Sequence, residues 1–309
     1  VQDTPMALDD LATTAPDAPV VIEVLANDIE PDGDPMSITN VTQGSNGTVA
    51  IQGGTNVLYT PDPGWSGTDT FQYWMHDGIT GSDSAVVTVW VSDATNTIYV
   101  ASTGAHVLPF NSWANAATNL NDAVAMAWTG DSVLVSNGIY HLNAPAVVRT
   151  QVSVRSINGP AHTTVAGGGS SRCFTLTGDG SRVDGFTVSN GFANVGGGVY
   201  VGPQASLNNC VVLGSDASQS GGGVYCASSG VVSRCEMAGN TANEGGGIFA
   251  LHGSRIQQCA VYDNTAFSAG GGIFCSNFVQ LLNCVVTSNS ASWGGGVYAT
   301  WLNRFESCE

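Results

Sequence analysis

The feature that most constrains the fold is a repeat of 24 to 25 residues in the second half of the chain. Two markers share this period. One is GGG followed by Val or Ile and an aromatic residue, beginning at Gly196, Gly221, Gly245, Gly270 and Gly294; the other is the series Cys210, Cys235, Cys259, Cys284 and Cys308. Such a period is typical of stacked units that bury their apolar faces on their neighbours. Because the unit has no helical pattern, the repeat predicts coils of a parallel β-helix.

Coils of a parallel β-helix lie about 4.8 Å apart, so equivalent residues form ladders. We expect each repeated Cys to face the core as a free thiol. The residue five positions after each Cys is predicted to lie in a recurring turn, because Asn tolerates the left-handed conformation and hydrogen-bonds its neighbours: Ser215, Asn240, Asn264 and Asn289. The aromatic ladder is predicted to face outward, either as a platform for sugar rings or as a structural stack: Tyr200, Tyr225, Phe249, Phe274 and Tyr298.

The β-helical domain is expected to span residues 97–309 and to begin with a capping helix at about residues 112–128, with Ser112 or Asn111 as its N-cap. The chain stops within a repeat, which predicts that it continues or that another molecule covers the open strand edges. Partners are therefore expected to be further copies or adjacent repeats of a longer chain.

Residues 1–93 show a different pattern, of short runs rich in Val, Ile, Thr and aromatic residues at intervals of about ten, which predicts a β-sandwich. A short linker is expected at residues 93–97. Residues 1–96 hold 14 acids and no Lys or Arg, within a chain of 24 acids and seven Arg. This charge disfavours nucleic acid and anionic membranes as partners. No apolar run approaches the roughly 20 residues that span a bilayer.

The stretch ANDIEPDGDPMS, residues 26–37, places acids on alternate positions beside a Gly that permits a sharp turn. Ca²⁺ takes six to eight oxygen ligands, and such a loop supplies closely spaced carboxylates. An EF-hand is rejected because its twelfth position would be Thr39 and strands flank the loop. The alternative to calcium is a solvated turn on an acidic surface.

The succession ALDD, VIEVLANDIEPDGDPMSITNVTQGSNGTVAI, VLYTPDPGWSGTDTFQYWMHDG and SAVVTVWV resembles a bacterial cadherin-like, Ig-like repeat found in tandem in large secreted and surface proteins. The resemblance implies calcium binding by acidic loops near the domain ends. It implies these ligands: Asp9, Asp10, Asn27, Asp28, Glu30, Asp32 and Asp34.

Residues 97–309 resemble the cap and coils of secreted right-handed β-helix proteins of the pectin-lyase-like architecture. The units NTANEGGGIF and NSASWGGGVY are similar to repeats of polymorphic outer-membrane proteins. The resemblance implies a fold that hosts both enzymes and inert stalks, so it does not imply an activity.

Catalytic signals are weak. A lyase needs a base beside a cation, but the chain has no Lys and its seven Arg show no recurrence on one face beside a carboxylate cluster. A glycosidase needs two carboxylates about 5 to 9.5 Å apart, and the best pair is Asp216 with Glu244. The sequence therefore favours a non-catalytic extracellular or cell-surface protein, structural or adhesive, stabilised by Ca²⁺. The alternatives are a secreted carbohydrate-active enzyme and a glycan-binding protein that recognises surface glycans.

Overall fold

The computed structural model describes residues 3–79, 81–92 and 96–309. The chain forms two compact units, residues 1–94 and 95–309. Three residues of the expected linker, 93–95, lie outside the described residues. The protein is nearly all β, with one short helix among the described residues.

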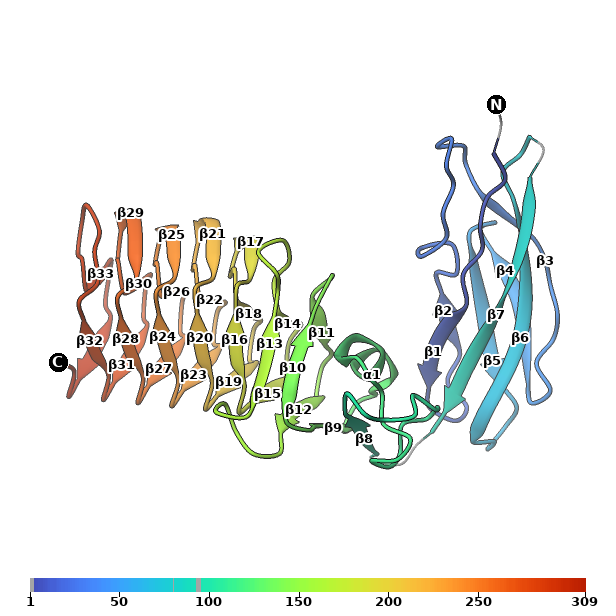
Figure 1. Ribbon diagram of the computed structural model, residues 1–309, viewed down its shortest axis with the longest axis horizontal. Helices are drawn as coiled ribbons and strands as arrows, with labels where there is room; N and C mark the ends of the chain where they lie inside the picture. Colours follow the sequence, from blue (N-terminus) through green and yellow to red (C-terminus); the bar gives the residue numbers. More distant parts are fainter. Residues whose placement is uncertain (1–2, 80, 93–95) are drawn as a thin grey trace. The chain divides into compact units, whose positions relative to one another are not determined.

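The N-terminal unit is a sandwich of two β-sheets (Figure 1). One sheet has the order β1 (Asp10–Thr14), β7 (Ser82–Val91), β6 (Gly67–His76) and β3 (Ser37–Val41). The other has the order β2 (Val20–Ile22), β5 (Asn56–Pro61) and β4 (Gly47–Gln52). Strand β1 runs parallel to β7, and the other pairs are antiparallel.

The core of the sandwich follows from the alternation of side chains along its strands, since successive side chains of a strand point to opposite faces. In β7 the alternate residues Ala85, Val87, Val89 and Val91 are buried. Tyr59 of β5 and Tyr73 of β6 are fully buried among them. Their hydroxyls therefore need hydrogen-bond acceptors inside the unit.

The C-terminal unit is a right-handed parallel β-solenoid whose coils lie side by side in Figure 1. All strand pairs are parallel. The nine-stranded sheet is formed, in order, by β34 (Arg304–Glu306), β31 (Gln280–Leu282), β27 (Arg255–Gln257), β23 (Val231–Ser233), β19 (Ser206–Asn208), β15 (Arg182–Asp184), β12 (Ser153–Ser156), β9 (Ser132–Val135) and β8 (Thr97–Val100). The valine sheet is formed by β10 (Gly138–His141), β13 (Thr163–Ala166), β16 (Thr187–Ser189), β20 (Val211–Leu213), β24 (Glu236–Ala238), β28 (Ala260–Tyr262) and β32 (Val285–Thr287).

Two further sheets complete the coils. The aromatic sheet is formed by β11 (Ala146–Val148), β14 (Phe174–Leu176), β18 (Val199–Val201), β22 (Val224–Cys226), β26 (Ile248–Ala250), β30 (Ile273–Cys275) and β33 (Val297–Ala299). The short sheet is formed by β17 (Phe192–Val195), β21 (Asp216–Ser220), β25 (Thr241–Glu244) and β29 (Thr265–Ala269). A complete coil passes through the nine-stranded, valine, short and aromatic sheets in turn, as in β19, β20, β21 and β22.

The helix α1 spans Leu120–Met126 and is shorter than the range 112–128 expected from the sequence. Its N-cap is Asn119, whose side chain accepts a hydrogen bond from the Asp122 N–H. The preceding residues are not helical because their backbone pairs with β8: the Ala117 N–H donates to the Tyr99 carbonyl. Tertiary pairing thus overrides the helical pattern in the first half of the predicted segment.

The solenoid interior confirms the predicted cysteine ladder. The first four repeated cysteines are buried, Cys308 is exposed, and all eight cysteines of the chain are free. The first Gly of each repeated GGG has φ between +59° and +68°. A Cβ on the second Gly would lie within about 3 Å of other backbone atoms of the solenoid. Glycine is therefore required in this turn, once for the positive φ and once for the close approach of the backbone.

The asparagine ladder hydrogen-bonds its neighbours, as predicted, but its residues are not in the left-handed conformation. Asn240 and Asn264 are fully buried, and the left-handed residues are the ones before them, Gly239 and Asp263. The Asn240 Nδ2 donates to Asn264 Oδ1 at 2.9 Å and to the Val212 carbonyl at 3.0 Å. These side chains form hydrogen bonds between successive coils in the interior, so their buried polar groups have partners.

Candidate functional site

The predicted calcium ligands fall into two groups. In the first, Glu30, Asp32 and Asp34 each offer an oxygen within 4.8 Å of the others, the one such cluster of acids, His or Cys in the described residues. Gly33 between them has φ +81°, so the chain turns sharply and brings alternate acids to one side. We call these three residues the loop cluster.

Backbone groups satisfy only part of the loop cluster. The Asp34 N–H donates to Glu30 Oε2 and the Asp3 N–H donates to Asp32 Oδ2, both at 2.7 Å. Glu30 Oε1 and Asp34 Oδ2 are buried and have no hydrogen-bond partner. Burying a carboxylate oxygen without a hydrogen-bond donor costs free energy, which a bound cation or a proton at these two atoms would offset.

The second group surrounds the start of β1 and comprises Asp9, Asp10, Asn27 and Asp28. The Leu8 N–H donates to Asp28 Oδ1 at 2.8 Å, and the Val86 N–H donates to Asp9 Oδ1 at 2.9 Å. The Asn27 amide donates to the Asp9 carbonyl at 3.2 Å. The group therefore ties β1 and β7 to the loop that begins at residue 26. We call it the strand cluster.

Asp10 is the unsatisfied member of the strand cluster. Its Oδ2 is buried without a hydrogen-bond partner. Burial first, and then the charges of Asp28 and Asp9, raise the pKa of Asp10 to about 7, against smaller opposing effects of Asn27 and Tyr73. The three carboxylates thus repel one another, and no Lys or Arg occurs in residues 1–96 to offset this.

The residues present fit a calcium ion. Ca²⁺ prefers oxygen ligands and accepts carboxylates, amide oxygens and water in flexible geometry. Orphaned carboxylate oxygens occur in both clusters, at Asp10, Glu30 and Asp34. Asp32 and Asp28 would supply further oxygens, one in each cluster.

Tyr73 contacts the strand cluster, and the sequence did not predict this contact. Its hydroxyl lies 2.8 Å from both carboxylate oxygens of Asp28, 45 residues away in the sequence. Burial, and the hydrogen bond to Asp28 next, raise the pKa of Tyr73 above its ordinary value, so it remains a donor. The sequence shows Tyr73 only as a core position of an alternating strand and carries no signal of its partner.

The aromatic ladder forms the predicted stack on the outer side of its sheet. Ring centroids of successive members lie 5.5, 5.4, 4.6 and 5.1 Å apart. The Arg172 guanidinium lies 5.4 Å from the centre of the first ring, Tyr200. Its Nε and Nη2 donate to the Gly196 and Val195 carbonyls, which fixes it at this end of the ladder.

The last rings of the ladder border a pocket of about 390 Å³. It is lined by Glu244, Ser268, Ala269, Phe274, Trp293, Tyr298 and Thr300. Aromatic faces beside a carboxylate and a hydroxyl are groups that contact sugar rings, apolar on the face and polar at the edge.

The best glycosidase pair of the sequence is not brought together by register. Asp216, at the start of β21, pairs with Thr241, whereas Glu244, at the end of β25, pairs with Ser220. The two carboxylates thus lie toward opposite ends of neighbouring strands. Asp216 does not line the pocket that Glu244 borders.

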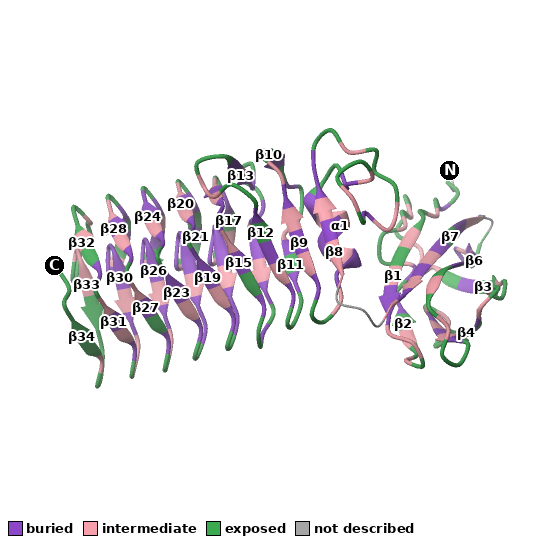
Figure 2. Ribbon diagram, turned by 90° about the horizontal axis from the view of Figure 1, so that it is seen from below, coloured by how far each residue is buried: buried purple, intermediate pink, exposed green. Residues whose placement is uncertain are grey.

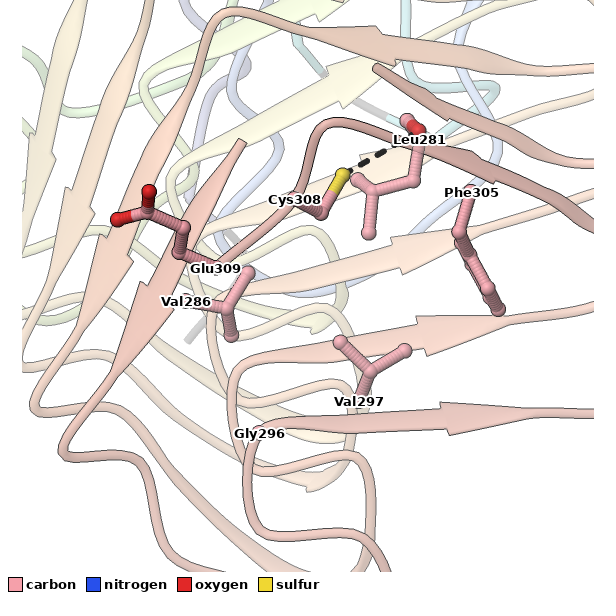
Figure 3. A pocket seen from close by; sticks show the side chains of 7 residues that line it. All are labelled: Leu281, Val286, Gly296, Val297, Phe305, Cys308 and Glu309. Carbon is pink, nitrogen blue, oxygen red and sulfur yellow. Dashed lines mark hydrogen bonds between the residues drawn. The ribbon is translucent and has the colours of Figure 1, made fainter. Parts of the chain in front are cut away.

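A second pocket, of about 340 Å³, lies at the last coil (Figure 3). It is lined by Leu281, Val286, Gly296, Val297, Phe305, Cys308 and Glu309. The Cys308 thiol donates to the Leu281 carbonyl at 3.4 Å. Because apolar core side chains form most of the lining, the pocket lacks the convergent polar groups of a ligand site.

Comparison with known proteins identifies the N-terminal unit. Residues 2–90 match the bacterial Ig domain family. No curated protein matches the chain. Among solved structures, the family 28 exopolygalacturonase of Yersinia enterocolitica is similar at 9% sequence identity and a TM-score of 0.22, over 98% of this chain and 79% of that chain. The chain therefore combines a bacterial Ig domain at residues 2–90 with a right-handed parallel β-solenoid.

Proposed function

We propose that this protein is a non-catalytic structural or adhesive component of a cell surface or extracellular assembly, with an Ig domain stabilised by Ca²⁺. A bacterial Ig domain with a β-helix is typical of surface or secreted proteins. None of the described helices is long and apolar enough to cross a membrane.

The observation that carries the proposal is the set of three orphaned carboxylate oxygens, on Asp10, Glu30 and Asp34. Each lies in a cluster of acids within a domain that has no Lys or Arg. Removing such atoms from water without a partner costs on the order of 1–3 kcal/mol each. A bound cation would offset this cost and cross-link the loop at residues 26–37 to the first and last strands of the domain.

The solenoid supports a role in reach and rigidity. Its coils are connected by continuous parallel ladders on every side and by an internal asparagine ladder. Contacts of this kind link each coil to its neighbours, so stiffness extends along the stack. The best carboxylate pair in the coils is separated by register, which removes the clearest signal for hydrolysis.

Electron microscopy with calcium and with a chelator tests the proposal. We expect rods or fibres in calcium that disperse or lose order on chelation, because the Ig domain loses the ions that tie its loops. The double variant Glu30→Gln/Asp34→Asn should resemble the chelated protein at all calcium concentrations. Isolated particles that calcium and the substitutions leave unchanged would contradict an assembly role.

A second candidate function, glycan binding, is favoured by the pocket at the end of the aromatic ladder. Phe274, Tyr298 and Trp293 offer ring faces there, and Glu244 offers a polar edge. A glycan array with the wild type and Trp293→Ala tests it. Binding that the substitution removes would support this function, and an array without binding would reject it. Release of reducing ends or unsaturated products from the same glycans would instead indicate an enzyme.

A further inference from the structure

Five of the seven arginines lie on one face of the solenoid. Four belong to strands of the nine-stranded sheet, and the fifth directly follows β23; all five are exposed: Arg155, Arg182, Arg234, Arg255 and Arg304. Figure 2 shows the strands β15, β19, β23, β27, β31 and β34 following one another along the solenoid. The grouping is hard to see in the sequence, because two of the five arginines stand at other positions of the repeat and the other three recur only after two or three coils. We call these five residues the basic face.

Few acidic side chains lie on the basic face to neutralise its charge. The strands of the nine-stranded sheet carry two, Asp184 and Glu306, and each pairs with one arginine. One more exposed acid, Asp179, lies in the turn before β15. Among the described residues, no carboxylate forms an ion pair with Arg155, Arg234 or Arg255. The face thus has an excess of positive charge in a chain with a net charge of −17.

Part of the basic face is held in place by a polar network. The Arg234 Nε and Nη2 both donate to Asn208 Oδ1, at 3.1 and 2.9 Å. The Asn208 amide is buried and donates to Asp184 Oδ2 at 2.9 Å, and Asp184 accepts from Arg182 at 2.6 Å. A guanidinium fixed in this way loses less conformational entropy when it binds a carboxylate.

The cations form a row along the stack. Arg182, Arg255 and Arg304 occupy the same register position on β15, β27 and β34. With neighbouring strands about 4.8 Å apart, the first two are separated by three strand steps, about 14 Å, and the last two by two steps, about 10 Å. This length suits a protein surface with several carboxylates rather than one small anion.

The acidic surface available within the protein is the Ig domain. Its exposed acids in the described residues are Asp3, Asp9, Asp17, Glu23, Asp32 and Asp62. Asp9 and Asp32 belong to the two candidate calcium clusters, and the Asp3 N–H donates to Asp32. Three acids remain clear of both clusters: Asp17, Glu23 and Asp62. The Gly64 N–H, two residues after Asp62, donates to Asp17 Oδ1 at 2.8 Å, so these two acids flank one loop contact. Carboxylates therefore remain for a partner when calcium occupies the clusters.

We propose that the basic face of one molecule binds the acidic Ig domain of a second copy. The inference rests on the proposed assembly role and names the surfaces that carry it. The two surfaces differ, so the contact is heterologous, and repeated contacts generate rings or open fibres rather than closed dimers. Because the contact is electrostatic and exposed, salt screens it.

Sedimentation velocity of the full chain in calcium, at low and high salt, tests the proposal. The variant Arg155→Gln/Arg255→Gln lowers the charge of the basic face by two, at exposed side chains without ion pairs. The matched control Thr265→Asp/Thr287→Asp makes the same change of net charge at exposed positions of other sheets. A third variant, Asp17→Asn/Glu23→Gln/Asp62→Asn, removes the proposed partner acids.

The proposal predicts that the wild type and the control associate at low salt and dissociate at high salt. The Arg variant and the acid variant should each weaken association by about 10-fold or more. Association that the Arg variant or the acid variant leaves unchanged would overturn this contact while leaving an assembly role intact. A wild type that stays monomeric in every condition would overturn both this contact and the assembly role. It would do so even if its basic face binds an added acidic polymer such as polyglutamate.

Discussion

The hydroxyl of Tyr73 in β6 donates to the carboxylate of Asp28, 2.8 Å from each of its oxygens. This contact ties the sandwich core to the acidic loop, and it holds one carboxylate of the strand cluster beside Asp10. The Ig domain is thus built so that a core side chain orients acids whose charges have no cationic residue to balance them.

Removing the Tyr73 hydroxyl should destabilise the Ig domain. We expect Tyr73→Phe to cost about 1.5–3 kcal/mol, because a hydrogen bond to a charged group is lost in a buried setting. Tyr59→Phe is the matched control. Its hydroxyl donates to Asp69 at 2.9 Å, but Asp69 also accepts from the Ser45 and Asn46 N–H groups. Asp28 has a weaker alternative, the single N–H of Leu8. Hydrogen exchange of the amides in β6 and β7 measures both. Equal losses in the two variants would contradict the special role of Asp28.

The stability of the calcium-free Ig domain should depend on pH through Asp10. Its pKa is raised from 3.8 to about 7, so the folded domain holds this proton more tightly than the unfolded chain does. The contribution of protonated Asp10 to the free energy of unfolding is therefore present in full at low pH, and it is lost as the pH rises from about 4 to about 7. Denaturation in chelator across this range should show a decline that Asp10→Asn reduces. An identical pH dependence in wild type and variant would contradict a raised pKa of Asp10 in the folded domain.

The asparagine ladder should be essential to the solenoid. Asn240→Ala would leave the Ser215 N–H, which donates to Asn240 Oδ1 at 2.9 Å, without its acceptor. It would also remove bonds to Val212 and Asn264. We expect a loss of about 2–4 kcal/mol in the free energy of unfolding, measured by urea denaturation. Asn194→Ala, at an exposed position of β17, should cost less than about 1 kcal/mol.

Thiol labelling should separate one cysteine from seven. Cys308 is exposed, whereas the other cysteines are buried, and burial raises the pKa of Cys173, Cys226 and Cys275 to about 12. A labelling reagent must reach the sulfur, so the buried cysteines are protected and the native protein should react rapidly at Cys308 alone. Denaturation without reductant should expose eight thiols, and Cys308→Ser should remove the rapid phase. Fewer than eight thiols would indicate disulfides.

The repeat could be read from the sequence because its markers are local and periodic. Equal spacing of GGG and Cys places equivalent residues on neighbouring coils, and the observed pairs, such as Tyr200 with Tyr225, follow from that count. The sequence could not tell an inward position from a turn, since both recur once per coil. The asparagine ladder was therefore assigned one residue away from the true left-handed position, such as Gly239.

Features that depend on tertiary pairing were beyond prediction. The helix is short because Ala117 pairs with β8, a contact between elements that no local pattern encodes. The basic face was missed because Arg234 and Arg255 occupy different positions of the repeat and share a face only in the folded solenoid. The acids of the loop cluster were found because their spacing is local, whereas Tyr73 was not, because its partner Asp28 is 45 residues away.

Calcium titration monitored by calorimetry tests the central claim most directly, using the full chain and the variants Glu30→Gln/Asp34→Asn and Glu23→Gln. The account predicts that calcium binds the wild type and raises the melting temperature of the Ig domain. The double variant should lose most of this response, and Glu23→Gln, an exposed acid outside both clusters, should retain it. A wild type that releases no binding heat and melts at the same temperature in calcium and in chelator would contradict the claim.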